Sequence, residues 1–457
     1  MAGRLPAAAS RVVASALAGG LLPLWERLLR CAGREPLGPE ASLLTCMLGK
    51  AEDAAGLCHM LACCEPRQGA ALVATWGKLL RTLAVPQLLS GLDEGADKPR
   101  TSLACALVSC AAAALIGAFG YLLPGSPGAA AAEAVAPQLQ LARLLSLALC
   151  EWLPSLVCIT REGALAMRTG QPNLEEMHTE AISVSSLAVL QWLPVLATRT
   201  RSGAGLGRAA EAVGDEAAAA ASSAAAGWRQ LLQREAGVVA LLGNMLKYEP
   251  VPSCSADQPT PTDNLNFVLN ACCCMAVAFP AEVRQAVLAA AAGANSSNGR
   301  VHVGWSPQWL RMLADGMCIS QAADGTALAT AASALAKQAE LWAAGGGEDG
   351  GELARAVTAM VAGPVHAAMA RALAPSPADA RAVLRTCANP ACDNLAGDSE
   401  AELPLRACGR CGGAWYCRKE CLAAHWRSGH REACAGRGAT AAGAAGPVES
   451  AAASSAP

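Results

Sequence analysis

Aromatic side chains and charges are scarce in this chain of 457 residues. It contains three Phe and three Tyr, and charged residues make up 16% of the sequence. Sustained alternation of β-branched and polar residues, which half-buried strands show, is nearly absent, whereas Ala and Leu dominate residues 1–386. Ala and Leu are the strongest helix formers. The composition therefore predicts an all-α body and disfavours a sheet-based fold.

Signatures of common enzyme classes are also missing. The chain has no G-x-x-x-x-G-K-[ST] phosphate loop, no kinase-type Gly-rich loop, no G-x-S-x-G and no Asn-His-x-Cys motif of the SET fold. Of six histidines, four stand alone among helical residues: His59, His178, His302 and His366. The formal net charge of −2 leaves no electrostatic footprint for phosphate backbones. These absences favour a non-enzymatic protein and disfavour nucleic acid as its partner.

The cysteines indicate a reducing environment. Of 21 cysteines, 14 lie before Cys387, including the adjacent Cys63 and Cys64 and the run Cys272–Cys274. Neighbouring cysteines on a helix point to different faces, and no regular disulfide framework is visible. They are predicted to be small buried apolar side chains. We therefore expect an intracellular location, in the cytoplasm or nucleus.

The most specific pattern is a set of eight potential metal ligands near the C-terminal end. Seven cysteines and one histidine occur as four close pairs: Cys387-x4-Cys392, Cys408-x2-Cys411, Cys417-x3-Cys421 and His430-x3-Cys434. A structural zinc ion takes four thiolate or imidazole ligands in a tetrahedron, and a catalytic zinc keeps a position for water. Eight ligands therefore predict two closed structural zinc sites and no catalytic metal.

The order of these pairs resembles the MYND zinc finger, with Trp415-Tyr416-Cys417-Arg418-Lys419-Glu420-Cys421 followed by Trp426, His430 and Cys434. The resemblance covers about residues 387–434 and implies that the pairs interleave. Carried over by position, it assigns one zinc to the first and third pairs and the other zinc to the second and fourth. The first set is Cys387, Cys392, Cys417 and Cys421, and the second is Cys408, Cys411, His430 and Cys434.

The resemblance also implies a groove for Pro-rich peptides. The chain departs from the family pattern in two ways. Leu422 stands where well-described members have Gln, and a Leu side chain makes no hydrogen bond. Trp426 is kept, so Leu422, Trp426 and Trp415 are the predicted contact surface for protein partners, among them Pro-rich peptides. The spacer 393–407 is longer than usual and acidic, and is predicted to be an exposed loop. His425 is predicted to be a surface residue and no ligand.

The helical body is predicted to be an irregular α-solenoid of armadillo or HEAT type. The tetrapeptides Glu151-Trp152-Leu153-Pro154 and Gln191-Trp192-Leu193-Pro194 recur forty residues apart, within the range for such repeats. A helix starting at Ser376-Pro377 is expected to run directly into Cys387 and to join the finger rigidly to the body. The domain prediction is a helical body over 1–386, a zinc finger over 387–434 and a disordered tail over 435–457.

A membrane protein is the alternative interpretation. Leu103–Leu123 is long and apolar enough to span a bilayer, and residues 1–25 are compatible with an organellar transit peptide. The composition also resembles that of Ala-rich algal MYND proteins, some of which are grouped with phytol or polyprenol kinase-like proteins. That resemblance implies a phytol kinase-like phosphotransferase in a plastid or other organelle membrane. Soluble scaffold and membrane kinase both remain open at this stage.

Overall fold

The structure is a computed structural model. It describes residues 5–6, 8–48, 54–90, 98–122, 136–168, 176–206, 215–248, 262–294, 304–319, 326–347, 350–361 and 364–434. The predicted disordered tail, the Pro-rich stretch 249–261 and Leu123 lie outside these ranges. Within them the fold is all-α apart from one two-stranded sheet in the C-terminal part.

The first part of the chain forms short helices and then three long ones. They are α1 (Arg11–Ala18), α2 (Leu21–Arg34), α3 (Pro39–Leu48), α4 (Ala54–Cys63), α5 (Pro66–Leu79), the π-helical turn η2 (Leu80–Ala84), α6 (Val85–Ser90), α7 (Lys98–Leu122), α8 (Ala136–Arg168) and α9 (Glu176–Leu206). Ser10 caps α1 by accepting the Val13 N–H, as cap residues do. Gly20 adopts a φ of 76°, which separates α1 from α2.

The second part of the body continues with shorter helices. They are α10 (Asp215–Gln230), the π-helical turn η3 (Leu231–Ala236), α11 (Val238–Tyr248), α12 (Thr262–Ala278), α13 (Pro280–Ala294), α14 (Pro307–Ile319), α15 (Thr326–Ala343), α16 (Gly351–Val361), α17 (Pro364–Ala372) and α18 (Pro377–Arg381). Gly237, with a φ of 66°, separates η3 from α11.

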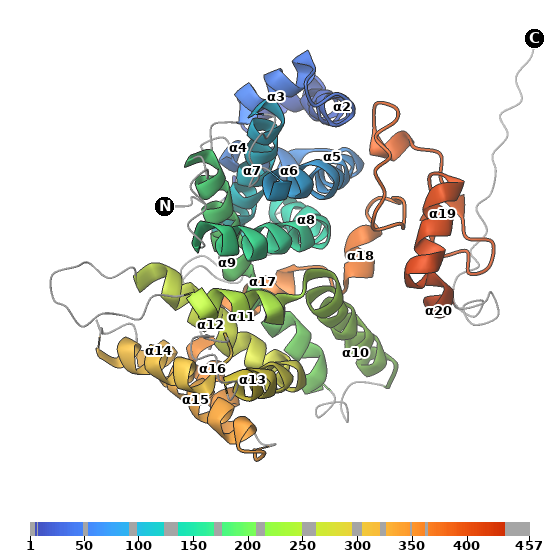
Figure 1. The fold of residues 1–457 in the computed structure, drawn as a ribbon. Helices are drawn as coiled ribbons and strands as arrows, with labels where there is room; N and C mark the ends of the chain where they lie inside the picture. The colour runs from blue at the N-terminus through green and yellow to red at the C-terminus, as the bar shows by residue number, and fades with distance from the viewer. Residues whose placement is uncertain are drawn as a thin grey trace, which may run out of the picture.

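The long helices α7, α8 and α9 pack on one another in the middle of the body (Figure 1). They contain three segments that are long and apolar enough to cross a membrane, Thr101–Leu122, Ala136–Gly163 and Met177–Arg201, and the count rises to six if three bent helix pairs are included. Length and composition alone define these candidates. In the folded chain, 67–78% of each of the three segments is buried against other parts of the protein.

The two Trp-Leu-Pro tetrapeptides occupy corresponding positions in adjacent helices. Trp152 of α8 donates its indole N–H to the Val73 carbonyl of α5 (2.9 Å), and Trp192 of α9 donates to the Leu115 carbonyl of α7 (3.0 Å). Helices α8 and α9 run antiparallel, since Thr160 contacts Ser185. The forty-residue interval thus spans one helix and its connection. The all-α class is confirmed, and the solenoid stays a prediction.

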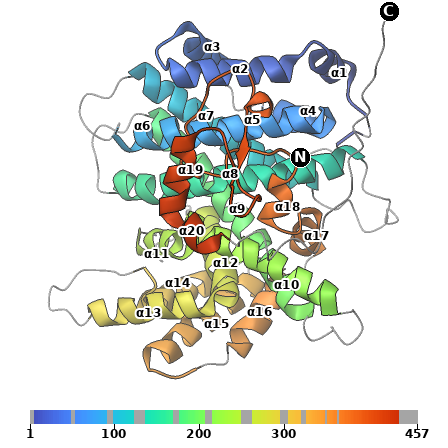
Figure 2. The ribbon, with the colours of Figure 1, turned by 90° about the vertical axis from the view of Figure 1, so that its right-hand side faces the viewer.

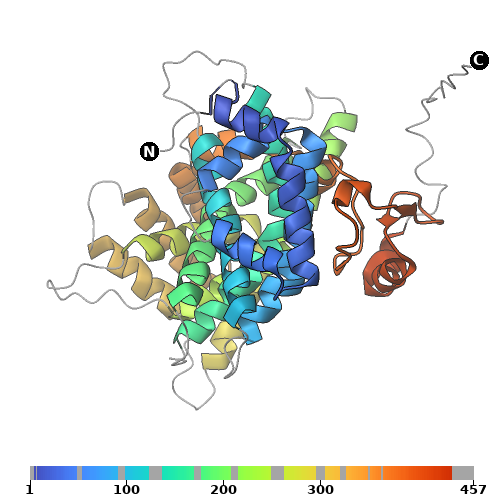
Figure 3. The same ribbon diagram turned by 90° about the horizontal axis from the view of Figure 1, so that it is seen from above.

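One continuous hydrophobic core extends through the helical body, and it includes Leu395 of the spacer. The finger has a small core of its own, formed by Tyr416 and four of the cysteines. In Figure 1 the finger lies beside α5, α8 and α18. Figure 2 views this side directly, and Figure 3 shows from above that the finger stands out from the helical stack. The spacer therefore connects the finger to one flank of the body.

Candidate metal centres and their junction with the helical body

A short hairpin and a bent helix form the framework of the finger. Strand β1 (Arg406–Ala407) pairs antiparallel with β2 (Trp415–Tyr416), and the chain continues through α19 (Lys419–His425), the π-helical turn η6 (Trp426–His430) and α20 (Arg431–Ala433). Gly429 has a φ of 135° inside η6, a conformation that L side chains rarely adopt. This bend turns the buried His430 toward the hairpin.

Backbone hydrogen bonds hold each close pair of ligands in a turn. Cys408 donates its N–H to the Ala414 carbonyl and accepts from the N–H of Gly412, which closes the turn containing Cys411. The Ala388 N–H donates to the Trp415 carbonyl at 2.7 Å, so the segment with the first pair lies along β2. These contacts bring residues distant in sequence to the two ends of one small hairpin.

The eight predicted ligands gather into two clusters. Cys387, Cys392, Cys417 and Cys421 form the first, and Cys408, Cys411, His430 and Cys434 form the second. In each cluster, the potential ligand atoms all lie within 4.8 Å of one another. The first and third pairs meet in one cluster and the second and fourth pairs in the other, which is the interleaving that the family resemblance implies.

The spacing inside the clusters fits tetrahedral zinc. Four sulfurs at a Zn–S distance of about 2.3 Å lie about 3.8 Å from each other. The Sγ atoms of Cys392 and Cys417 are 3.6 Å apart, and those of Cys417 and Cys421 are 3.7 Å apart. In the second cluster, Cys411 Sγ lies 3.7 Å from His430 Nε2. Each cluster is able to bind one zinc ion, and four ligands leave no position for a substrate. Two structural zinc ions fit the finger.

His425 supports the second cluster and is not a ligand. Its Nδ1 is 3.1 Å from the Tyr416 hydroxyl, and its ring stacks on that of His430 at 5.0 Å between centroids. Burial, and next the proximity of His430, lower its pKa, which favours a neutral ring. His425 belongs to neither of the two clusters. It is half-buried beside Tyr416 and His430, so the predicted surface position holds only in part.

The acidic spacer between the first and second ligand pairs is exposed at Asp393, Asp398 and Glu402, as predicted, but it is anchored to the body at Glu400, which corrects the expectation of a fully exposed loop. Glu400 is 1% exposed, within a short 3-10 helix, η5 (Glu400–Glu402). Its carboxylate accepts hydrogen bonds from Lys78 of α5 at 2.6 and 2.7 Å and from Arg30 of α2 at 3.0 Å. Glu26 and Thr75 complete this arrangement, in which Thr75 accepts from Arg30 and donates to Glu26. We call these five residues the junction cluster.

Backbone groups of the spacer enclose the same two cations. The Arg30 guanidinium donates to the carbonyls of Ala396 and Gly397, and Lys78 Nζ donates to the Asn394 carbonyl at 3.1 Å. In the opposite direction, Glu26 accepts from the Glu400 N–H and from the Ser399 hydroxyl. Two cations thus meet two carboxylates in the interior with their hydrogen-bonding groups used. A buried ion pair is weak evidence for net stability, but it defines one geometry because every other one leaves a buried charge unpaired.

Within the junction cluster, burial raises the pKa of Glu26 above its usual value. The hydrogen bonds that Glu26 accepts from Glu400 and Ser399 lower this pKa, but burial has the larger effect. No pattern in the sequence assigns Glu26, Arg30 and Lys78 to the finger. The one available local signal is that Glu26 and Arg30 have the i,i+4 spacing of an ion pair on one helix.

The helix that leads from the body to the finger is shorter than predicted. Helix α18 begins at a capping box, in which Ser376 and Asp379 exchange hydrogen bonds, as the sequence indicated. It ends at Arg381, six residues before Cys387, so the prediction of a helix that runs directly into the first ligand is wrong. Arg381 instead pairs with Glu151 of α8 and Glu235 of η3. The link is therefore held by ion pairs to the body and not by a continuous helix.

The three predicted contact residues lie on two different surfaces. Leu422 is 36% exposed, and Trp426 follows it by four residues across the α19–η6 junction, which places both on one face. The Arg410 guanidinium lies 5.9 Å from the Trp426 ring centroid. Trp415 lies elsewhere, under the Arg385 guanidinium at 4.7 Å and facing the body.

Two tetrahedral Cys/His clusters on a hairpin and a bent helix define a structural zinc finger with two sites. In a comparison with known protein families, residues 387–434 match the MYND finger family. No curated protein and no solved structure matches the chain. The chain therefore carries a MYND zinc finger at residues 387–434, while the helical body has no family assignment from these comparisons.

Proposed function

We propose that the protein is a zinc-binding scaffold for protein–protein interaction, in which the helical body presents the MYND finger to a partner. The observation that carries this proposal is the junction cluster. It attaches the finger to α2 and α5 through Glu400, and neither Leu422, which is 36% exposed, nor the half-buried Trp426 takes part in it. A finger held in one orientation loses less freedom on binding than a tethered one, which favours recognition.

The surface formed by Leu422 of α19 and the half-buried Trp426 of η6 suits an apolar, extended peptide. Trp426 offers a flat ring on which a proline ring packs, and Leu422 adds aliphatic area beside it. The protein partner is thus a Pro-rich segment recognised mainly by shape, because Leu422 provides no side-chain hydrogen bond. We propose Leu422 and Trp426 as its contact residues and assign Trp415 to a separate surface.

Peptide binding by the zinc-loaded full chain tests this proposal. A panel of fluorescein-labelled Pro-rich dodecapeptides is titrated and read by fluorescence polarisation. We expect binding that weakens at least ten-fold in Leu422→Ala and in Trp426→Ala, and that is unchanged in Lys419→Ala, an exposed residue of the same helix. Zinc content measured in each variant excludes unfolding as the cause. Equal affinities in all four proteins, or no binding by the wild type, would contradict the proposal.

For the rest of the chain we propose an α-solenoid-like body over 1–386, the finger over 387–434 and a tail over 435–457. We also propose an intracellular location, in the cytoplasm or nucleus, and the chemistry of the thiols supports it. Burial raises the pKa of Cys58, Cys64 and Cys150 to about 12, so these cysteines stay protonated and unreactive. The seven cysteine ligands of the finger also require reduced sulfur.

A membrane-embedded phytol or polyprenol kinase-like enzyme is the alternative, and the apolar segments in α7, α8 and α9 favour it. The extensive burial of those segments against the rest of the chain favours the scaffold. Carbonate extraction of membranes together with phytol-dependent nucleotide turnover separates the two. Extraction without turnover supports the scaffold, and a carbonate-resistant protein that consumes nucleotide only with phytol supports the kinase.

A further inference from the structure

Two adjoining cavities follow the junction between body and finger, away from Leu422 and Trp426. One, of about 400 Å³, is lined by residues from four separate segments: Arg67, then Ala382–Arg385, then Ala401, Leu403 and Leu405, and finally Trp415. The other, of about 330 Å³, lies between α8 and the α18 segment and shares Ala382 and Val383 with the first. We call the pair the junction groove. Its larger half exists only because the spacer is docked on the body.

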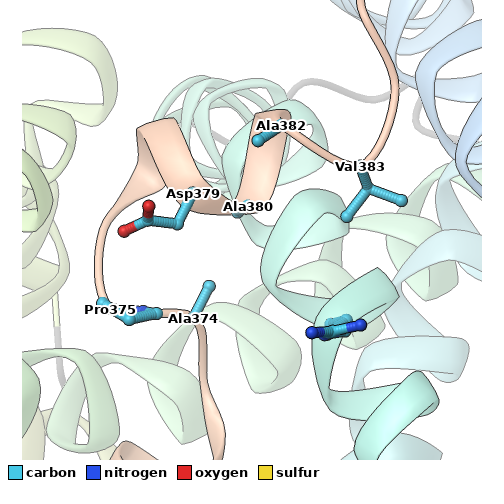
Figure 4. A pocket seen from close by; sticks show the side chains of 7 residues that line it. Ala374, Pro375, Asp379, Ala380, Ala382 and Val383 are labelled. Atoms are coloured by element: carbon cyan, nitrogen blue, oxygen red, sulfur yellow. The ribbon is translucent and has the colours of Figure 1, made fainter. Parts of the chain in front are cut away.

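Figure 4 shows the smaller half from close by. Asp379 projects from α18, Val383 lies just beyond the end of that helix, and Ala374 and Pro375 form part of the wall. Arg143 of α8 also lines this cavity. Asp379 is the one acid among the lining residues of either half, and its carboxylate already accepts from the Ser376 N–H and hydroxyl. Its charge is therefore used within the helix cap.

Three exposed arginines border the junction groove: Arg67, Arg143 and Arg385. Among the residues that the structure describes, none of them has a carboxylate within salt-bridge distance. The chain as a whole carries a net charge of −2, so this concentration of cations is local. Arg385 is held over the Trp415 ring at 4.7 Å, which orders its guanidinium without neutralising it.

Apolar side chains form the floor between these arginines. Leu403, Leu405 and Trp415 are half-buried in the larger cavity, so each still offers part of its surface. Nearby acids oppose the basic character only in part. Glu65 is engaged as the cap of α5 by accepting the Gln68 N–H. Glu402 is exposed but does not line the groove.

We propose that the junction groove binds an acidic peptide segment of a partner protein, with an apolar side chain on Leu403, Leu405 and Trp415 and carboxylates on Arg67, Arg143 and Arg385. The charge of the rim selects the acid, because Arg binds carboxylates through paired N–H groups. The cavity sizes suit single side chains on a peptide of a few residues. This site is additional to the surface proposed above for Pro-rich peptides, since neither Leu422 nor Trp426 lines it.

A random dodecapeptide display library tests the proposal on the immobilised, zinc-loaded full chain. The variants are the double substitution Arg67→Ala with Arg385→Ala, and a control of equal charge change, Arg11→Ala with Arg355→Ala, two exposed arginines elsewhere. We expect wild-type and control proteins to enrich peptides with Asp or Glu beside Leu, Phe or Trp. A selected peptide, synthesised with a fluorophore, should bind the groove variant at least ten-fold more weakly than the control.

Three results would overturn the proposal: no enrichment of acidic residues, enrichment that survives in the groove variant, or equal weakening in groove and control variants, which indicates non-specific charge attraction. A single-stranded 20-mer oligonucleotide that binds better than every selected peptide would assign the basic rim to nucleic acid and likewise overturn it. Trp426→Ala distinguishes the two binding surfaces. It should leave the acidic peptide bound, so failure of the Pro-rich site does not affect this test.

Discussion

The helical body and the MYND finger bury very different amounts of apolar surface. In the body, Trp76, Trp152, Trp192 and Trp228 are at most 2% exposed within a core that extends across the chain. The finger buries one tyrosine and a handful of cysteines. A core of that size does not fold a chain of this length without cross-links or metal. The body is thus maintained by packing and the finger by two zinc sites, and they meet in a cluster of buried charges that belongs to both.

From this difference we predict that the loss of one zinc-binding sulfur destabilises the finger more than the loss of any one side chain destabilises the body. Cys417→Ala should reduce bound zinc from two ions to one or none, because a structural site contributes about 10 kcal/mol of folding free energy in small zinc domains. Zinc quantification and circular dichroism measure the outcome, and most of the helical signal should persist.

Cys46→Ala is the matched control, since Cys46 is an exposed free cysteine of α3. It should keep two zinc ions per chain. Full zinc occupancy in Cys417→Ala would exclude the assignment of Cys417 as a ligand.

The next largest effect is expected at the junction cluster. Glu400→Gln removes the negative charge between Arg30 and Lys78, and breaking a buried ion pair in this way costs about 3–5 kcal/mol. Glu402→Gln makes the same chemical change two residues away at an exposed position and should alter stability by less than about 0.5 kcal/mol. Urea denaturation gives both values. Equal effects would show that Glu400 is not buried between the two cations.

Within the body, a single indole hydrogen bond should have a smaller effect. Trp192→Phe leaves the Leu115 carbonyl without its second donor and should cost about 1 kcal/mol for the hydrogen bond, in addition to the lost ring volume. Trp415→Phe, at a half-buried ring of the finger, should cost less. Thermal unfolding measures both losses of stability. A larger loss of stability for Trp415→Phe would contradict the view that side-chain packing stabilises the body more than the finger.

The smallest expected effect is a pH dependence from Glu26. Because burial raises the pKa of Glu26 above its usual value of 4.5, the folded state binds more protons than the unfolded state between 4.5 and that raised pKa. The contribution of Glu26 to the unfolding free energy should therefore fall as pH rises through this window. The difference between wild type and Glu26→Gln isolates it, since acid release of zinc affects both proteins. A difference that is independent of pH would contradict the raised pKa.

How far the sequence predicted this structure depends on the range of the interactions. The long apolar segment in α7 follows from local composition, the number of zinc sites follows from ligand spacing, and the interleaved pairing of the ligands follows from the resemblance to the MYND finger, so these three features were predicted. The docking of the spacer was not, because Arg30 and Glu400 are separated by 370 residues and no local pattern links them. The same reason explains why Trp415 was grouped with Leu422 and Trp426. Only the docked spacer places the Trp415 side of the hairpin against the body.

Amide hydrogen exchange in the spacer tests the account most directly. The Glu400 N–H donates to the Glu26 carboxylate, and Leu403 donates to the Glu400 carbonyl, so both amides are protected if the spacer is docked. We predict that a peptide covering 396–403 exchanges slowly in the zinc-loaded wild type and much faster in Glu400→Gln with zinc retained. Complete exchange of this segment within seconds in the wild type would mean an exposed loop, and would contradict a finger fixed to the body.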